Sequence, residues 1–326
     1  MAERVLPDAL LGWSGFVGSV LGAQHSFDAR YRRADIHESA GREFGTLVCA
    51  AAPGSMFAAN RDPESDAAAI DGLIAALSRI RAQRMVLIST IAVLARFDGQ
   101  QDERTADFQT ETPYGANRRR LEAACAGQFE TCLILRLPAL FGPGLRKNFI
   151  FDILNPVPAM LTHERMATVL DALPADLRDA MTGLYDRDDA RGLMTVDRAR
   201  VAALPGRAPL EAALVESGLS ARAFTNPDSS FQFYDMGALW DDISLGLGAG
   251  LDTLHIAPEP LRAGDVHAAL TGAEMQANAA RVHHEDMHTR HAALWGRDGP
   301  YSAGAGEVLE RLRRFHTCMR GAESCG

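Results

Sequence analysis

The sequence predicts an α/β protein with a doubly wound parallel sheet and a smaller, mostly helical lobe toward the C-terminus. Up to residue 145, short apolar runs typical of buried strands alternate with amphipathic helical patterns, and residues 66–81 repeat apolar side chains at a helical period. Such alternation favours parallel strands covered by helices on both faces. Residues 176–189 and 191–207 are dense in Arg, Asp and Ala at helical spacing, which predicts an inserted helical lobe.

The earliest strand-to-helix junction carries a glycine motif. Gly12, Gly15 and Gly18 follow the apolar run at residues 9–11 and precede an apolar stretch at 16–21. Glycine tolerates positive φ in a tight turn, and the following helix offers free N–H groups to a pyrophosphate. The spacing therefore predicts a dinucleotide site, although a glycine triplet alone is weak evidence. Pro7 limits the strand to a start at about Asp8.

Three later segments support this interpretation. Residues 47–53 form a buried-strand pattern that ends in small residues, and residues 85–90 form a strand that ends in Ser89 and Thr90. Residues 112–118 open a helix that contains Tyr114. Residues 132–144 form another strand that continues into a loop at Pro138.

In this order and spacing, the segments resemble the extended branch of the short-chain dehydrogenase/reductase superfamily, which includes NAD(P)-dependent sugar epimerases, dehydratases and reductases. The resemblance covers residues 8–145, is weaker over 231–260, and is absent from 150–225. It implies a Rossmann-like fold whose catalytic helix carries Y-x-x-x-K; here the motif reads Tyr114 to Arg118. The expected domains are a dinucleotide-binding domain at 1–149, with 228–262 returning to it, and a substrate-binding lobe at 150–227 and 263–326.

The resemblance implies roles for three side chains. Tyr114 would transfer a proton, Thr90 would hydrogen-bond the substrate, and Arg118 would anchor the ribose and lower the pKa of the tyrosine. Tyr114 and Arg118 are four residues apart on one helix, so they share a face. The alternatives are a surface Tyr/Arg pair and a threonine that caps a turn. Arginine in place of lysine puts turnover in doubt more than cofactor binding.

Arg32 and Arg33 follow the second expected strand at residues 27–31. Two arginines there suit the 2′-phosphate of NADP, so NADP is weakly preferred over NAD. The alternative is a solvated basic turn. The full set of expected cofactor-binding residues is Gly12, Gly15, Phe16, Val17, Gly18, Arg32, Arg33, Ala51, Ala52, Pro53, Ser89 and Pro138.

Composition restricts the partners. The 326-residue chain has a net charge of −9, which disfavours nucleic acid and anionic membranes. Five cysteines without a C-x-x-C pair favour a reduced, cytoplasmic setting. His284, His288 and His291 would share a helix face, but such a stripe more often faces substrate or solvent than metal, so we expect no metal site.

The leading hypothesis is an NAD(P)-dependent oxidoreductase or epimerase/dehydratase that acts on a small molecule. A sugar nucleotide is one candidate, although Ala139 stands where many sugar-nucleotide enzymes of the family have asparagine. The alternative is a non-catalytic NAD(P)-binding sensor or scaffold protein. The resemblance also implies a homodimer formed through the helices at residues 66–81 and 113–125.

Overall fold

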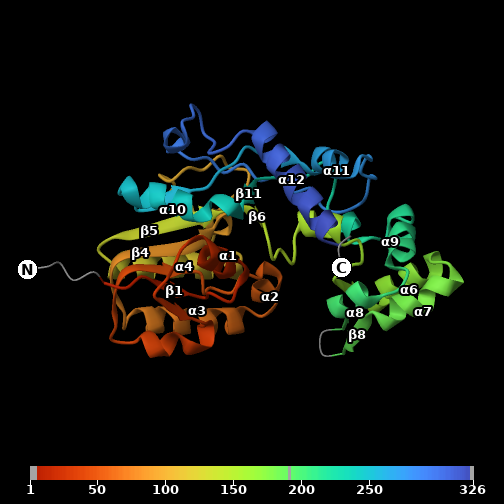
Figure 1. Cartoon of the computed structure of the whole chain (residues 1–326), viewed down its shortest axis with the longest axis horizontal. Helices are drawn as coiled ribbons and strands as arrows, with labels where there is room; N and C mark the ends of the chain where they lie inside the picture. Colours follow the sequence, from red (N-terminus) through yellow and green to blue (C-terminus); the bar gives the residue numbers. More distant parts are fainter. Residues whose placement is uncertain (1–5, 190–191, 324–326) are drawn as a thin grey trace, which may run out of the picture. The chain divides into compact units, whose positions relative to one another are not determined.

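The computed structural model describes residues 6–189 and 192–323 (Figure 1). The chain divides into two compact units. The first comprises the residues up to Leu145, Phe231–Leu261 and His284–Leu312. The second comprises Arg146–Ser230, Arg262–His283 and the residues from Arg313 onward. Among the described residues, no helix is long and apolar enough to cross a membrane.

A six-stranded sheet forms the centre of the first unit, and every strand pair whose register is defined runs parallel. Its order is β12-β5-β4-β3-β1-β2, so the chain moves from β1 to one side and then returns to the other. This confirms the predicted doubly wound, Rossmann-like α/β fold. The strands are β1 (Ala9–Leu11), β2 (Ala29–Tyr31), β3 (Glu43–Cys49), β4 (Arg81–Thr90), β5 (Cys132–Leu137) and β12 (Thr253–His255).

Helices cover both faces of this sheet, and Figure 1 shows α10 and α3 on opposite sides. One buried core contains side chains of α3 and α4, and a second contains side chains of α1 and α10. The strands between them are apolar on both faces, which explains their continuous apolar runs. The helices are α1 (Phe16–Gln24), α2 (Met56–Arg61), α3 (Pro63–Leu77), α4 (Pro113–Gln128) and α10 (Leu239–Gly248).

A short connection joins β2 to β3. The 3-10 helix η1 (Arg33–Ser39) leads from β2 into β3, which leaves β2 at the edge of the sheet.

The later part of the first unit contains the strand, helix and strand expected over residues 231–260. β11 (Phe233–Asp235) pairs in parallel with β6 (Ala139–Phe141), and α10 and β12 follow. Other elements outside the central sheet are η2 (Ile91–Val93), β10 (Ser230–Phe231), η4 (Met236–Ala238), β13 (Leu261–Arg262), η5 (Ala292–Trp295) and the long helix α12 (Ala305–Glu323).

The second unit is helical, but it also contains a small antiparallel sheet of order β7-β9-β8 that the sequence did not predict. We expected helices across residues 176–189 and 191–207, yet strands occupy part of both ranges. Leu193–Val196 forms antiparallel pairs with both neighbouring strands, so this segment is the central strand of the small sheet. The elements are α5 (Phe149–Leu154), β7 (Met160–Thr162), α6 (His163–Ala172), α7 (Ala175–Gly183), β8 (Tyr185–Asp188), β9 (Leu193–Val196), α8 (Arg198–Ala203), α9 (Arg207–Glu216), η3 (Ala221–Phe224) and α11 (Ala263–Thr271).

Residues 284–312 differ from the expected domain division, which placed them in the substrate-binding lobe. They belong to the first unit. The Gln232 side chain donates a hydrogen bond to Met287 O and accepts one from Met287 N, and Ser302 N donates to Ala257 O. The histidines expected on one helix face also lie elsewhere, because residues 284–291 are not helical.

Candidate functional site

The residues expected to form the site follow the ends of the parallel strands. Gly12 follows β1, Arg32 follows β2, Ala51 lies beyond β3, Thr90 ends β4 and Pro138 follows β5. Because parallel strands end at the same edge, these positions share one edge of the sheet. The strand order reverses between β1 and β3, and ligands of such folds bind at the carboxyl ends beside this point.

The glycine turn has the geometry that the sequence predicted. Gly12 has φ +84°, and a Cβ there would lie 2.5 Å from Ala50 O. A Cβ on Gly18 would lie 2.1 Å from Gly12 O, so the turn and the first turn of α1 touch through backbone atoms. Gly15, the N-cap of α1, differs, since a Cβ there meets only Gly12 O at 3.4 Å. The fold therefore requires glycine at positions 12 and 18, whereas Gly15 keeps the outer side of the turn open.

Two arginines border this turn. The Arg32 guanidinium lies 5.2 Å from the centre of the Trp13 ring, which belongs to the glycine turn. Arg33 Nε donates a hydrogen bond of 3.0 Å to Ala51 O in the loop after β3. Both side chains are exposed. They thus lie beside the strand ends where a dinucleotide's adenosine half binds in this fold.

Thr90 and Tyr114 meet at the end of β4. The Thr90 hydroxyl is close enough to the Tyr114 hydroxyl to act on its pKa, and Thr90 Oγ1 accepts a hydrogen bond from Ala92 N at 3.2 Å. Gly115 permits this meeting, because a Cβ there would lie 2.2 Å from Ala92 O. Tyr114 N donates to Asn60 Oδ1 at 3.0 Å, which fixes the start of α4 against α2.

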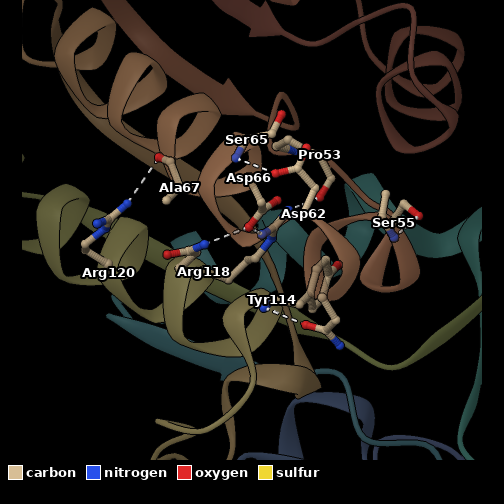
Figure 2. A network of polar contacts seen from close by, with 12 residues as sticks. Pro53, Ser55, Asp62, Ser65, Asp66, Ala67, Tyr114, Arg118 and Arg120 are labelled. Atoms are coloured by element: carbon tan, nitrogen blue, oxygen red, sulfur yellow. Dashed lines mark hydrogen bonds and ion pairs between the residues drawn. The ribbon is translucent and has the colours of Figure 1, made fainter. Parts of the chain in front are cut away.

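Arg118 occupies a different place from the one expected of a ribose anchor (Figure 2). Its guanidinium forms an ion pair with Asp66 of α3 and donates to Pro53 O in the loop after β3. The guanidinium carbon lies 4.0 Å from the centre of the Tyr114 ring, so the cation faces the ring. The Arg118 and Asp66 side chains are 3% and 4% exposed.

This arrangement changes the electrostatics of Tyr114. We expected the arginine to lower the pKa of the tyrosine toward neutrality. Burial instead raises the pKa of Tyr114 above its ordinary value of 10, and the neighbouring Arg118 and the hydrogen bond with Thr90 oppose that effect. The Asp66 carboxylate adds to the rise. In this structure the tyrosine is therefore protonated at neutral pH and set up as a proton donor.

A buried ionic network lies beneath the Ser89–Thr90 strand end. Ser89 was expected to line the cofactor, but its Oγ donates to Glu122 Oε1 at 2.6 Å. Glu122 also accepts from Arg136 Nε at 3.0 Å and Nη2 at 2.7 Å. Arg136 Nη1 donates to His255 Nε2 at 3.0 Å, while His255 Nδ1 donates to a backbone carbonyl. Burial lowers the pKa of His255, which keeps the ring neutral.

Glu122 and Arg136 were not predicted as site residues, although the sequence contains a signal for them. Arg136 interrupts an otherwise apolar strand, so it needs a buried acidic partner. Glu122 lies four residues after Arg118 and eight after Tyr114, on the same face of α4. One helix face thus supplies both the site and the ionic network below it.

The other expected residues lie in the surrounding shell. Phe16 and Val17 begin α1 and pack against a buried core, while Ala51 and Pro138 are buried. In the described part of the chain, no group of three or more His, Cys, Asp or Glu side chains is placed to hold a metal. Cys49, Cys125 and Cys132 are buried free thiols, and Cys318 is exposed. Cys325 lies outside the described residues.

Comparisons with known proteins agree with this fold. Residues 29–171 match the model of the NAD dependent epimerase/dehydratase family. No protein in the search of curated proteins matches significantly. This family match confirms the predicted resemblance.

Solved structures resemble the chain along almost all of its length. A dTDP-4-dehydrorhamnose reductase from Bacillus anthracis in complex with NADP is 12% identical with a TM-score of 0.57, over 97% of this chain and 99% of that one. RMD from Pseudomonas aeruginosa complexed with NADPH is 14% identical with a TM-score of 0.60, over 97% and 99%. A UDP-N-acetylglucosamine 4-epimerase from Methanobrevibacter ruminantium is 11% identical with a TM-score of 0.60, over 97% and 98%. At these identities the likeness shows the shared fold.

Proposed function

We propose that this NAD(P)-dependent enzyme of the short-chain dehydrogenase/reductase type, identified through the epimerase/dehydratase domain of residues 29–171, transfers hydride to or from a hydroxyl or carbonyl carbon of a small molecule. The observation that carries the proposal is the pair of hydroxyl groups at the end of β4. The hydroxyls of Thr90 and Tyr114 are neighbours at the sheet edge that also carries the glycine turn. A substrate oxygen placed between them would receive two hydrogen bonds.

The residues at the sheet edge fit a dinucleotide. A Cβ would clash with backbone at Gly12 and Gly18, whereas the outer side of Gly15 stays open, as close approach of a pyrophosphate requires. The backbone N–H groups at the start of α1 would bind that pyrophosphate, and Arg32 and Arg33 would bind a 2′-phosphate. When bound, the cofactor supplies hydride transfer. Tyr114 would then donate the proton to a substrate oxygen that Thr90 orients.

Cofactor binding tests the first part of the proposal. Gly15→Val should abolish NADPH and NADH binding, because the side chain projects to the open side of the turn while the backbone at Gly15 has an ordinary φ of −79°. Gly72→Val is the matched control, since Gly72 is an exposed helical residue with no atom near its Cβ position. Calorimetric titration measures the affinity for NADPH and NADH. If folded Gly15→Val binds them as tightly as the wild type does, the glycine turn is not the pyrophosphate site.

Turnover tests the second part. A screen of sugar nucleotides and small ketones with both cofactors should identify a substrate, since several structural neighbours bind or act on nucleotide sugars. Tyr114→Phe removes only the hydroxyl, so the chemical step should slow by about 10²–10⁴-fold while cofactor affinity persists. A substrate turned over equally well by Tyr114→Phe contradicts the proton-transfer role.

A second candidate function is binding of NAD(P) without turnover, as in a sensor or scaffold. The observation that favours it is the engagement of Arg118 with Asp66 and Pro53, which takes the cation away from ribose hydroxyls. Cofactor binding without any substrate in a broad screen would favour this candidate. We also propose a homodimer through α3 and α4, which light scattering of the purified protein tests.

A further inference from the structure

The ion pair beside Tyr114 is built from three separate segments. Asp66 lies in the first turn of α3, which Asp62 caps by accepting from Ser65 N at 3.0 Å. Asn117 Nδ2 donates a hydrogen bond of 2.8 Å to the same Asp66 oxygen that receives the Arg118 guanidinium. The second guanidinium nitrogen reaches Pro53 O. Arg118 therefore ties α4 to both α3 and the loop after β3.

We propose that Asp66 is a positioning residue of the tyrosine site: it holds the Arg118 guanidinium against the face of the Tyr114 ring and cancels much of its charge, so that Tyr114 stays a protonated donor. The proposal rests on the proposed function only in taking Tyr114 as the proton-transfer group. It assigns to α3 a role in the site that could not be expected from the sequence.

The shape of the arginine side chain makes this arrangement possible. A guanidinium is a planar fork that can bond two acceptors at once while its face stacks on an aromatic ring, and an ammonium group cannot do all three. Arg118 uses one nitrogen for Asp66, one for Pro53 and its face for Tyr114. The arginine in place of the family's lysine and the acid on α3 therefore act together, because the arginine can stack on Tyr114 while it binds Asp66.

Asp66 decides how strongly the cation acts on the tyrosine. The charged groups that act on the Tyr114 hydroxyl are Arg118 of α4 and Asp66 of α3, and Thr90 of β4 is its polar neighbour. An unopposed cation at about 4 Å in a partly shielded site would favour the phenolate by roughly 10³-fold. The buried Asp66 carboxylate, paired with that guanidinium, opposes this effect, while burial is the main cause that raises the pKa of Tyr114.

Titration of the tyrosine tests the proposal without cofactor or substrate. 3-Fluorotyrosine placed at position 114 reports its ionisation by ¹⁹F NMR, and fluorination brings that ionisation into a milder pH range. Asp66→Asn should increase the acid constant of the labelled residue at least tenfold, while Asp66→Glu, which keeps the carboxylate, should change it less. Asp71→Asn is the matched control, because Asp71 pairs with Arg120 between the same two helices at 3.0 Å but in an exposed position. An unchanged acid constant in folded Asp66→Asn overturns the proposal.

A second variant keeps the test decisive if the lone buried arginine prevents folding. Asp66→Asn/Arg118→Gln removes both charges, so no buried charge lacks a partner. If Asp66 cancels the cation, this double variant should differ from the wild type by less than tenfold in the acid constant. If the acid constant of Tyr114 in the double variant is about a thousandfold lower than in the wild type, Arg118 acts on the tyrosine without opposition and the proposal is refuted. Neither titration involves turnover. If the substrate screen finds no substrate and the proposed function fails, the acid constants of Tyr114 still test the role of Asp66.

Discussion

Replacing Glu122 with glutamine should destabilise the protein more than the loss of any surface ion pair. The Glu122 carboxylate is fully buried and accepts hydrogen bonds from Ser89, Arg119 and twice from Arg136. A glutamine amide has a single acceptor oxygen, and its NH₂ group would face one of these donors. Arg136, which is 2% exposed, would then keep its charge without a buried counter-ion. Breaking a buried pair in this way costs about 3–5 kcal/mol.

Urea denaturation followed by circular dichroism measures this cost as a change in the free energy of unfolding. Glu130→Gln is the control, because Glu130 is exposed at the turn before β5 and such a change stays within about 0.5 kcal/mol. The double variant Glu122→Gln/Arg136→Met should recover part of the loss, since it removes the unpaired cation. If Glu122→Gln costs less than about 1 kcal/mol, the pair behaves as a surface ion pair and the reasoning is wrong.

Three further predictions follow from charge and burial. Arg32→Ala/Arg33→Ala should weaken NADPH binding by about 1.5–3 kcal/mol for each lost charge-assisted bond and leave NADH binding unchanged, with Arg30→Ala as control in the same titration; equal weakening of both cofactors would contradict the preference. Burial raises the pKa of Asp152 to about 7, so the carboxyl favours the folded state below its unfolded pKa near 4 and this contribution is lost as the pH rises through 7. Asp152→Asn should therefore raise the free energy of unfolding at pH 8 relative to wild type but not at pH 4, and a constant difference across that range would exclude the mechanism. Iodoacetamide at pH 8 should label the exposed Cys318 in the native protein. It should label the buried Cys49, Cys125 and Cys132 only after unfolding, because burial raises the pKa values of these thiols, and mass spectrometry of the peptides measures the labelling.

The fold could be predicted because its signals are local. A strand buried on both faces appears as a continuous apolar run, and a glycine that must lie against a backbone oxygen appears as a glycine at the turn that follows such a run. The apolar run is found at Ala9–Leu11, and the glycines are Gly12 and Gly18, where the structure leaves no room for a side chain. The small sheet of the second unit had no comparable signal, since strands of three or four residues such as Leu193–Val196 are too short to show a period distinct from a helix.

The site was predicted less completely, because its partners are far apart in the sequence. The four-residue spacing of Tyr114 and Arg118 places them on one helix face, but it cannot tell which distant acid that face meets. Asp66 lies 52 positions earlier, where it looks like an ordinary acidic residue in the first turn of a helix. For the same reason the hydrogen bond from Ser89 to Glu122 could not be predicted, and the expected contact of Ser89 with the cofactor stays a prediction.

Two buried ion pairs hold α4, the helix that carries Tyr114, in place. Arg118 points toward α3 and meets Asp66, and one turn later Glu122 meets Arg136 of β5. A helix held by two such pairs is costly to displace, because moving it would leave charges buried without partners. Gly115, packed against Ala92 O, removes the remaining freedom at the N-terminal end. Tyr114 is therefore placed against Thr90 by the fold itself, and Gly115→Ala should separate the two hydroxyls by pushing the helix from η2. The measurable consequence is a loss of turnover comparable to that of Tyr114→Phe with cofactor affinity retained, whereas full activity of Gly115→Ala would show that the contact between α4 and η2 does not set the site.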